Sequence, residues 1–378
     1  MKRHLPTKTL LRWLLLVVST VAVTAVLTVV GVPSAALFAA LVAGTVLALL
    51  SLAPAGVPRG AGLAAQGVLG VYIGTMVHRD SLSALGSHWP IVSAVVIATL
   101  AISVIAGALM GLHRDISPLT GALALVAGGA SGLVAIAREL GGDDRVVAVV
   151  QYLRVGIVTA TMPVMVTLVF APDRSHPAAV IETTSAPWYL STAMVAVIAA
   201  FGTLAGRLVR LPGAGLLGPM ALTVVLELTG FSFGLAVPVV LVQIGYALIG
   251  WQAGVAFTRE SLRSVGRALP LALGLIAALS IATAGLGIVL SRVTGITPLE
   301  GYLATSPGGV YAVLATSVET GSNVTFIVAA QVLRILVMLF VAPLMARGMA
   351  ALTRRLGRRG AQSREITEAS REPIAVAD

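Results

Sequence analysis

The sequence predicts an all-α integral membrane protein built from two tandem repeats, and three observations support this fold class. Of its 378 residues, 57% are hydrophobic and only 11% are charged, against about 25% charged residues in an ordinary soluble domain. The mean hydropathy of +0.99 reflects more apolar surface than a globule of this size can hide from water. The third observation is an internal match between stretches about 180 residues apart.

Apolar segments follow one another along the chain, six on each side of a polar stretch at 171–186. Most are close to the length of about 20 apolar residues that crosses a bilayer. The first follows a basic start, as a signal peptide does, but its length predicts an uncleaved first helix. In order, the segments are Leu10–Val30, Ser34–Leu52, Gly60–Val77, Trp89–Leu112, Pro118–Leu140, Val146–Phe170, Trp188–Val209, Leu216–Thr229, Leu235–Phe257, Ala268–Leu290, Pro298–Ser317 and Val324–Met345.

The two sets of segments divide the chain into matching units. We predict a first membrane repeat at 1–170, a polar linker at 171–186, a second membrane repeat at 187–347 and a basic, disordered cytoplasmic tail at 348–378. A shift of 180 aligns Pro118–Met165 with Pro298–Met345 without a gap, and 15 of these 48 positions are identical. The matches include Gln, Glu and Arg, which are too costly in lipid to recur by chance. The sequence therefore indicates an internal duplication.

The orientation of the two repeats depends on whether the fifth segment of each one crosses the membrane. If it crosses, the copies are parallel, and the loops place four arginines inside and eight outside. If it enters and leaves on one side as a hairpin, the copies are inverted, with nine arginines inside and three outside. Cytoplasmic loops carry an excess of basic residues. We therefore favour inverted repeats of about five spanning helices plus a re-entrant segment, with 10–12 apolar segments in all.

Glycine-rich breaks interrupt both fifth segments near their middles, at Gly128-Gly129-Ala130-Ser131-Gly132 and Ser306-Pro307-Gly308-Gly309. A helix that stops inside a membrane presents free N–H groups at one end and free carbonyls at the other. Each break therefore offers a site for an ion or a carboxylate. The alternative is that these glycines only let helices pack closely, since glycine is common in spanning helices.

One arginine lies deep in the sixth segment of each repeat. Arg154 and Arg334 are eight to ten residues into these segments, which is about 12 to 15 Å of helical rise. An arginine at that depth requires a carboxylate, a carbonyl or water as its partner. Gln151 and Gln331 precede them by one turn and share their helix face. One interpretation is a polar face that lines a substrate path and binds an anion; the other is a structural pairing of each arginine with a glutamate.

The glutamates at the ends of the broken segments are the partners in that second interpretation. Glu139 and Glu319 also suit a role as proton or cation carriers, or they are loop residues in contact with water. Glu227 has no acidic counterpart in the first repeat, so it is a weaker candidate for the site. Its side chain could instead extend to the membrane–water interface. The predicted substrate or ion path comprises Gly128, Gly129, Ser131, Glu139, Gln151, Arg154, Ser306, Gly308, Gly309, Glu319, Gln331 and Arg334.

Several kinds of chemistry lack the residues they need. The sequence has no cysteine, and none of its five histidines has a histidine or carboxylate three or four positions later. There is no nucleotide-binding glycine motif, and Ser131 has no evident histidine base. We therefore predict no cofactor, no metal and no catalysis. The net charge of +10 lies at the termini and in short loops, which is typical of topology determinants rather than of a nucleic-acid-binding surface.

The repeated motif resembles that of a known bacterial family. A Gly-Gly break, a glutamate before a glycine turn and a Gln-x-x-Arg helix occur in both repeats, as in the AbrB duplication membrane proteins. The motifs are Gly128-Gly129, Glu139-Leu140-Gly141 and Gln151-Tyr152-Leu153-Arg154, then Gly308-Gly309, Glu319-Thr320-Gly321 and Gln331-Val332-Leu333-Arg334. The second copy departs from the first, with Val318, Asn323 and Thr325 where Arg138, Asp143 and Arg145 stand. The resemblance implies the labels used for that family, ammonia monooxygenase and regulator of gene expression.

The function predicted from these observations is that of a secondary transporter for a small solute, which works by alternating access between the two repeats. The alternative is a membrane-embedded regulator that acts through a cytoplasmic partner, with a monooxygenase the least favoured because the sequence lacks a metal-ligand cluster. The expected partners are the lipid bilayer and a small-molecule or ion substrate. Assembly into a homo-oligomer is an open alternative. We expect a bacterial inner-membrane location with both termini cytoplasmic.

Overall fold

A computed structural model describes residues 7–77, 79–126, 130–170, 187–211, 213–338 and 341. Within these residues every regular element is a helix, and five helices are long and apolar enough to cross a membrane. The predicted all-α membrane fold is therefore confirmed. The five helices are Lys8–Val30, His88–Met110, Asp144–Phe170, Trp188–Leu208 and Gly266–Thr294.

The helices follow the predicted segments closely. The first unit contains α1 (Thr7–Val30), α2 (Ala35–Leu49), α3 (Arg59–Gly74), α4 (Arg79–Met110), α5 (Pro118–Leu125), α6 (Ala130–Leu140) and α7 (Asp144–Val164), which continues as η1 (Met165–Phe170). The second contains α8 (Trp188–Leu208), α9 (Ala214–Thr229), α10 (Val239–Gly254), α11 (Arg259–Val265), η2 (Gly266–Ala268), α12 (Leu269–Thr294), α13 (Pro298–Thr305), α14 (Val310–Glu319) and a final helix described at Val324–Met338.

Equivalent helices in the two units begin 180 residues apart. Helices α3 and α10 begin at Arg59 and Val239, and α5 and α13 begin at Pro118 and Pro298. The prolines occupy the first helical turn, where a missing N–H costs nothing, and Ser117 and Thr297 cap the two helices by accepting backbone N–H groups. This spacing supports the predicted duplication, while the relative orientation of the units stays a prediction.

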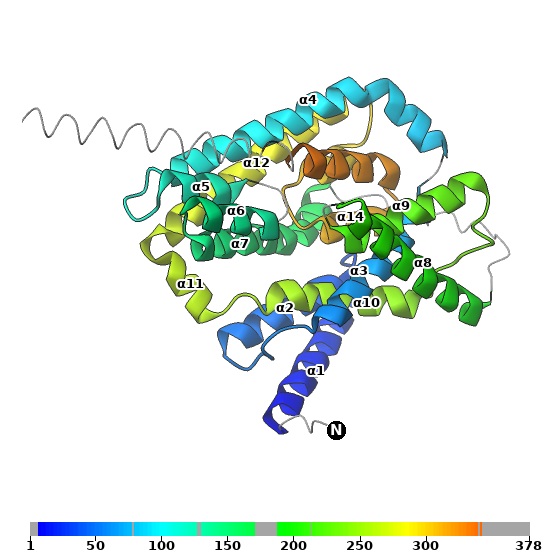
Figure 1. Cartoon of the computed structure of the whole chain (residues 1–378), viewed down its shortest axis with the longest axis horizontal. Coiled ribbons are helices and arrows are strands. Elements are labelled where there is room, and N and C mark those ends of the chain that lie inside the picture. The colour runs from blue at the N-terminus through cyan, green and yellow to red at the C-terminus, as the bar shows by residue number, and fades with distance from the viewer. Residues whose placement is uncertain are drawn as a thin grey trace, which may run out of the picture.

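Helices of the first unit pack directly against helices of the second. Helix α2 of the first unit packs on α10 of the second, and α3 of the first packs on α9 of the second. Helices α4 and α12, which occupy equivalent places in the two units, run side by side along the top of Figure 1. One apolar core includes residues of α2, α3, α9, α10, α13 and α14, so it belongs to both units at once.

The short helices α5 and α13 lie against long helices through glycine contacts. A Cβ at Gly287 of α12 would lie 2.6 Å from the carbonyl oxygen of Gly301 in α13, and one at Gly107 of α4 would lie 2.8 Å from Cα of Ala122 in α5. Side chains cannot fit at such separations. The close approach lets a helix of only 8 residues, about 12 Å long, pack along its neighbour without gaps.

Both broken segments turn back on themselves. The backbone N–H of Asp143, just after α6, donates to Oγ1 of Thr120 at the start of α5 over 2.9 Å. Likewise the N–H of Asn323, just after α14, donates to Oε1 of Glu300 at the start of α13 over 2.7 Å. The end of each segment therefore lies beside its own beginning. This geometry supports the predicted hairpin, in which the break lies at the tip.

Candidate functional site

The Gln-x-x-Arg motif of the second unit binds the carbonyl end of the half-helix α13. Nε2 of Gln331 donates to the carbonyl of Leu303 over 2.8 Å, with longer contacts of 3.3 and 3.4 Å to the carbonyls of Ala304 and Ser306. Nη1 of Arg334 donates to the carbonyl of Ser306 over 2.5 Å, and its Nη2 donates to Oε1 of Gln331 over 2.6 Å. These donors satisfy carbonyls that the end of a helix leaves free.

The first unit repeats the arrangement on α5. Nε2 of Gln151 donates to the carbonyls of Leu123 and Val126, both over 2.8 Å, and Nη1 of Arg154 donates to the carbonyl of Leu125 over 2.9 Å. Unlike its counterpart, Oε1 of Gln151 has no hydrogen bond among the described residues. The two centres are therefore similar in plan but differ in the number of bonds that hold each arginine.

Helix lengths explain why these residues meet the breaks. Arg154 is ten positions after Asp144, the first residue of α7, and Arg334 is ten positions after Val324, which is about 15 Å of rise. The half-helices α5 and α13 extend about 12 Å from the same ends. A side chain that points slightly back along its helix then reaches the hairpin tip.

The two centres lie close together in the middle of the protein. Arg154 and Arg334 are only 4% and 6% exposed. The break in the second unit also packs on α7 of the first, because a Cβ at Gly308 would lie 2.9 Å from Val158 and one at Gly309 would lie 3.2 Å from Val155. The hairpin tip of one unit therefore contacts the helix that carries the arginine of the other.

Neither arginine has a carboxylate partner within the described residues, where the one ion pair is Arg138 with Asp144 on the surface. Nε of Arg154 and Nε of Arg334 have no hydrogen bond there either, and Oγ of Ser306 is also buried and unbonded. The structural pairing with Glu139 and Glu319 is thus not seen. The result is two buried positive charges that are only partly neutralised by helix ends.

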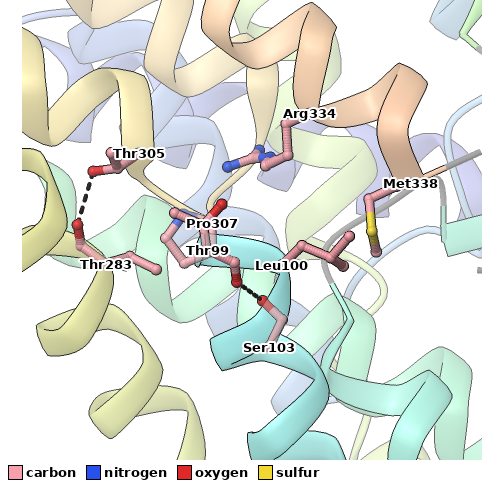
Figure 2. A pocket seen from close by; sticks show the side chains of 8 residues that line it. All are labelled: Thr99, Leu100, Ser103, Thr283, Thr305, Pro307, Arg334 and Met338. Carbon is pink, nitrogen blue, oxygen red and sulfur yellow. Dashed lines mark hydrogen bonds between the residues drawn. The ribbon is translucent and has the colours of Figure 1, made fainter. Parts of the chain in front are cut away.

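A small cavity adjoins Arg334 (Figure 2). Its volume is about 10 Å³, which is room for about one water molecule. Hydroxyl groups of α4, α12 and α13 surround it. In this structure they donate to backbone carbonyls; for example, Oγ1 of Thr305 donates to the carbonyl of Thr283 over 2.9 Å. Because hydroxyl protons rotate, these groups can also face an anion. The lining residues are Thr99, Leu100, Ser103, Thr283, Thr305, Pro307, Arg334 and Met338.

The other predicted site residues fall in three places. Gly128 and Gly129 lie outside the described residues, and Ser131 lies in the first turn of α6. Glu139 is exposed at the end of α6. Glu319, its counterpart at the end of α14, lines a separate and larger pocket. Within the part of the chain that the structure describes, no group of three histidines or carboxylates is placed to hold a metal.

Sequence reasoning missed the hydroxyl groups around the cavity. Thr99, Ser103 and Thr283 lie in apolar helices where threonine and serine bond to their own backbone, so the sequence gives them no distinguishing pattern. Thr305, by contrast, directly precedes the predicted break. Its position next to Ser306 was the one feature of the sequence that could have identified a hydroxyl group of this cavity.

Comparisons with known proteins agree with the resemblance in the repeated motif. A family model described as "Transition state regulatory protein AbrB" matches residues 36–350. The chain is 32% identical over 337 residues to "Putative regulator AbrB" of Escherichia coli (strain K12), covering 89% of this chain and 96% of that protein. It is 27% identical over 295 residues to "Uncharacterized protein YhjN" of Bacillus subtilis (strain 168), covering 74% of this chain and 76% of that protein.

Proposed function

The chain belongs to the AbrB family, and within that family we propose that it is a secondary transporter for a small anion. The transported anion binds between the two arginine centres. The two halves give it access to one side of the membrane and then to the other. Transport of this kind involves no chemical step, and the names of the two relatives do not describe enzymes.

The observation that carries this proposal is the pair of buried guanidinium groups without carboxylate partners among the described residues. Burying an unpaired charge is expensive, and inside a membrane such a charge marks a functional site by default. The carbonyl ends of α5 and α13 offset part of the charge, but the N-terminal end of α14 at the same break adds partial positive charge. A small anion at this place would complete the neutralisation.

The arrangement of the broken helices supports alternating access. Each hairpin belongs to one half of the chain, and the tip of the second rests on α7 of the first. The cavity beside Arg334 has room for only about one water molecule, so the described conformation is closed around the centre. Sliding or rocking of one half against the other is the common way in which repeat-based transporters open such a site.

Transport by purified protein in proteoliposomes tests the proposal. Currents driven by gradients of chloride, formate, acetate, succinate and phosphate would identify the anion class. The variants Arg154→Gln and Arg334→Gln are expected to lose at least tenfold in rate, while Arg292→Gln, at the exposed end of α12, is the matched control. Full transport by the double variant Arg154→Gln with Arg334→Gln would refute the site.

A second candidate, a membrane-embedded regulator, is favoured by the names of the matched family and of the relative from Escherichia coli. In that case a cytoplasmic partner would read the conformation of the membrane part, most simply through the tail beyond Arg354, which lies outside the described residues. We place this chain in the bacterial inner membrane with both termini cytoplasmic, as the loop charges favour. Loss of a regulatory effect in cells, with transport intact, after removal of the tail would support this candidate.

A further inference from the structure

A second pocket lies apart from the arginine centres. It has a volume of about 820 Å³ and is formed by α1, α2, α3, α10 and the end of α14. It shares no lining residue with the cavity beside Arg334. Its size is within the range of pockets that hold drug-sized organic molecules. The two sites therefore suit ligands of very different size.

Glu319 supplies the acidic group of this pocket. The residue is exposed to the pocket space, and its Oε2 accepts a hydrogen bond from the backbone N–H of Ser34. Ser34 precedes α2 and has a φ of 53°, a left-handed conformation that aims its N–H at the carboxylate. This N–H holds the carboxylate in place through Oε2. In the described part of the chain, Glu319 has no basic partner.

Two buried hydroxyl groups lie on the helices that form the pocket or at their ends. Oγ of Ser34 and the phenol oxygen of Tyr246 belong to residues that are each 1% exposed, and neither makes a hydrogen bond of acceptable geometry within the described residues. Ser34 contacts Glu319 through its backbone N–H. Buried hydroxyls are normally bonded. These two are placed to respond when a ligand changes the position or the charge of the carboxylate.

The rest of the lining combines apolar walls with groups that attract cations. Thr20, Thr24 and Thr28 of α1 each donate their hydroxyl proton to a carbonyl in the preceding turn, over 2.7 to 2.8 Å. The oxygen lone pairs of Thr24 and Thr28 are thus left for the pocket. Trp251 donates its Nε1–H to Thr20 over 2.8 Å, and an indole ring attracts cations through its face. Valine, alanine and isoleucine side chains form most of the remaining wall.

We propose that this pocket binds an organic ammonium or similar cation with an apolar body, held by Glu319. An inorganic ion would leave most of the volume and its apolar wall unused, and an anion would meet the carboxylate. The cation is carried either by a soluble molecule or by the amine headgroup of a lipid. This site does not depend on the proposed anion transport, because it uses none of the residues of the arginine centres.

Equilibrium dialysis of the full chain in detergent tests the site with tritiated tetraphenylphosphonium, a cation with four apolar rings. Tetraphenylborate has the same shape and the opposite charge, so it is the matched control ligand, and empty micelles give the background. We expect saturable binding of the cation and none of the anion. Glu319→Gln should weaken binding by about tenfold or more, while Glu139→Gln, at the exposed counterpart position, should not change it.

Further variants locate the ligand and separate this site from the other. Ala247→Phe keeps Glu319 but places a phenyl ring in the pocket, and it should also weaken binding. Arg334→Gln should leave binding unchanged, so a failure of anion transport and a failure of cation binding can be told apart. Retention by the wild type, but not by Glu319→Gln, of phosphatidylethanolamine in mass spectra would assign the cation to a lipid. Equal binding of both tetraphenyl ions, or full binding by a folded Glu319→Gln variant, would overturn the proposal.

Discussion

Replacing Gln331 by leucine tests whether the glutamine residues stabilise the hairpin tips. Leucine has a similar volume, so the change removes hydrogen bonds without creating a large cavity. In the wild type, Nε2 of Gln331 serves the carbonyls of Leu303, Ala304 and Ser306, and its Oε1 accepts from Nη2 of Arg334. Ser306 keeps its bond from Nη1 of Arg334. The variant therefore leaves the carbonyl of Leu303 and one arginine N–H without their strongest partners.

The expected cost follows from these two groups. Each buried polar group left without a partner costs about 1–3 kcal/mol, and more if it is charged, so Gln331→Leu should lower the free energy of unfolding by about 4 kcal/mol. Gln151→Leu also releases carbonyls, but Oε1 of Gln151 has no hydrogen bond to lose within the described residues. It leaves two neutral carbonyls, rather than a carbonyl and a charged N–H, without a partner, so its cost should be smaller, about 3 kcal/mol. Gln243→Leu, at an exposed position on α10, is the control and should stay within about 0.5 kcal/mol.

Thiol labelling can measure this order in detergent, because the natural chain has no cysteine. A single cysteine at Ala315, which is 0% exposed, reacts only when the protein opens. The labelling rate in each background then gives the free energy of opening. Equal protection in Gln331→Leu and Gln243→Leu would refute the idea that the glutamine satisfies the end of α13. A larger loss of protection in Gln151→Leu than in Gln331→Leu would refute the stabilising role assigned to the bond from Nη2 of Arg334 to Oε1 of Gln331.

Three further predictions concern packing, topology and the tail. Gly301→Ala should destabilise the protein by about 3 kcal/mol because its Cβ would collide with the backbone of α12, whereas Gly285→Ala, which has open space, should be neutral or slightly stabilising in the same labelling assay. Cysteines at Gly142 and Ser322 should be labelled from opposite sides of intact cells, with Ser322 accessible from outside; labelling of both from outside would contradict the inverted hairpins. Deletion of Gly357–Asp378 should leave transport unchanged in proteoliposomes, and lost transport in a folded variant would contradict a self-contained membrane core.

The hydrophobic pattern was sufficient to predict the helices, because lipid requires each crossing segment to be long, apolar and internally hydrogen-bonded. The predicted break that begins at Ser306 agrees with the end of α13 at Thr305. In the first unit α5 ends at Leu125, but Ala130, Ser131 and Gly132 of the predicted break belong to α6, and Gly128 and Gly129 lie outside the described residues. One boundary differs: α4 begins at Arg79, whereas the apolar segment begins at Trp89. Polar residues can extend a helix beyond the apolar run, so hydropathy marks the part in lipid rather than the whole helix.

The partners of the site residues were harder to predict. Depth alone required a carboxylate, a carbonyl or water for Arg154 and Arg334, and the structure provides carbonyls. Glu139 and Glu319 align in the repeat, yet Glu319 is bonded to Ser34, which is 285 positions away in sequence. A contact of that kind depends on how α2 is placed in three dimensions. Periodicity along the chain carries no information about it.

The packing of helices from one half against helices of the other has a consequence for how the protein is made. During synthesis, α2 and α3 enter the membrane before the helices that cover them, α10 and α9, exist. The first half must therefore wait in the bilayer with its pairing faces occupied by lipid or by an insertion chaperone. Two such chains, each equivalent to one half, could cover one another in the same way. A chain equivalent to one half would therefore need a second copy to cover its pairing faces, whereas the full-length chain carries both partners in one molecule.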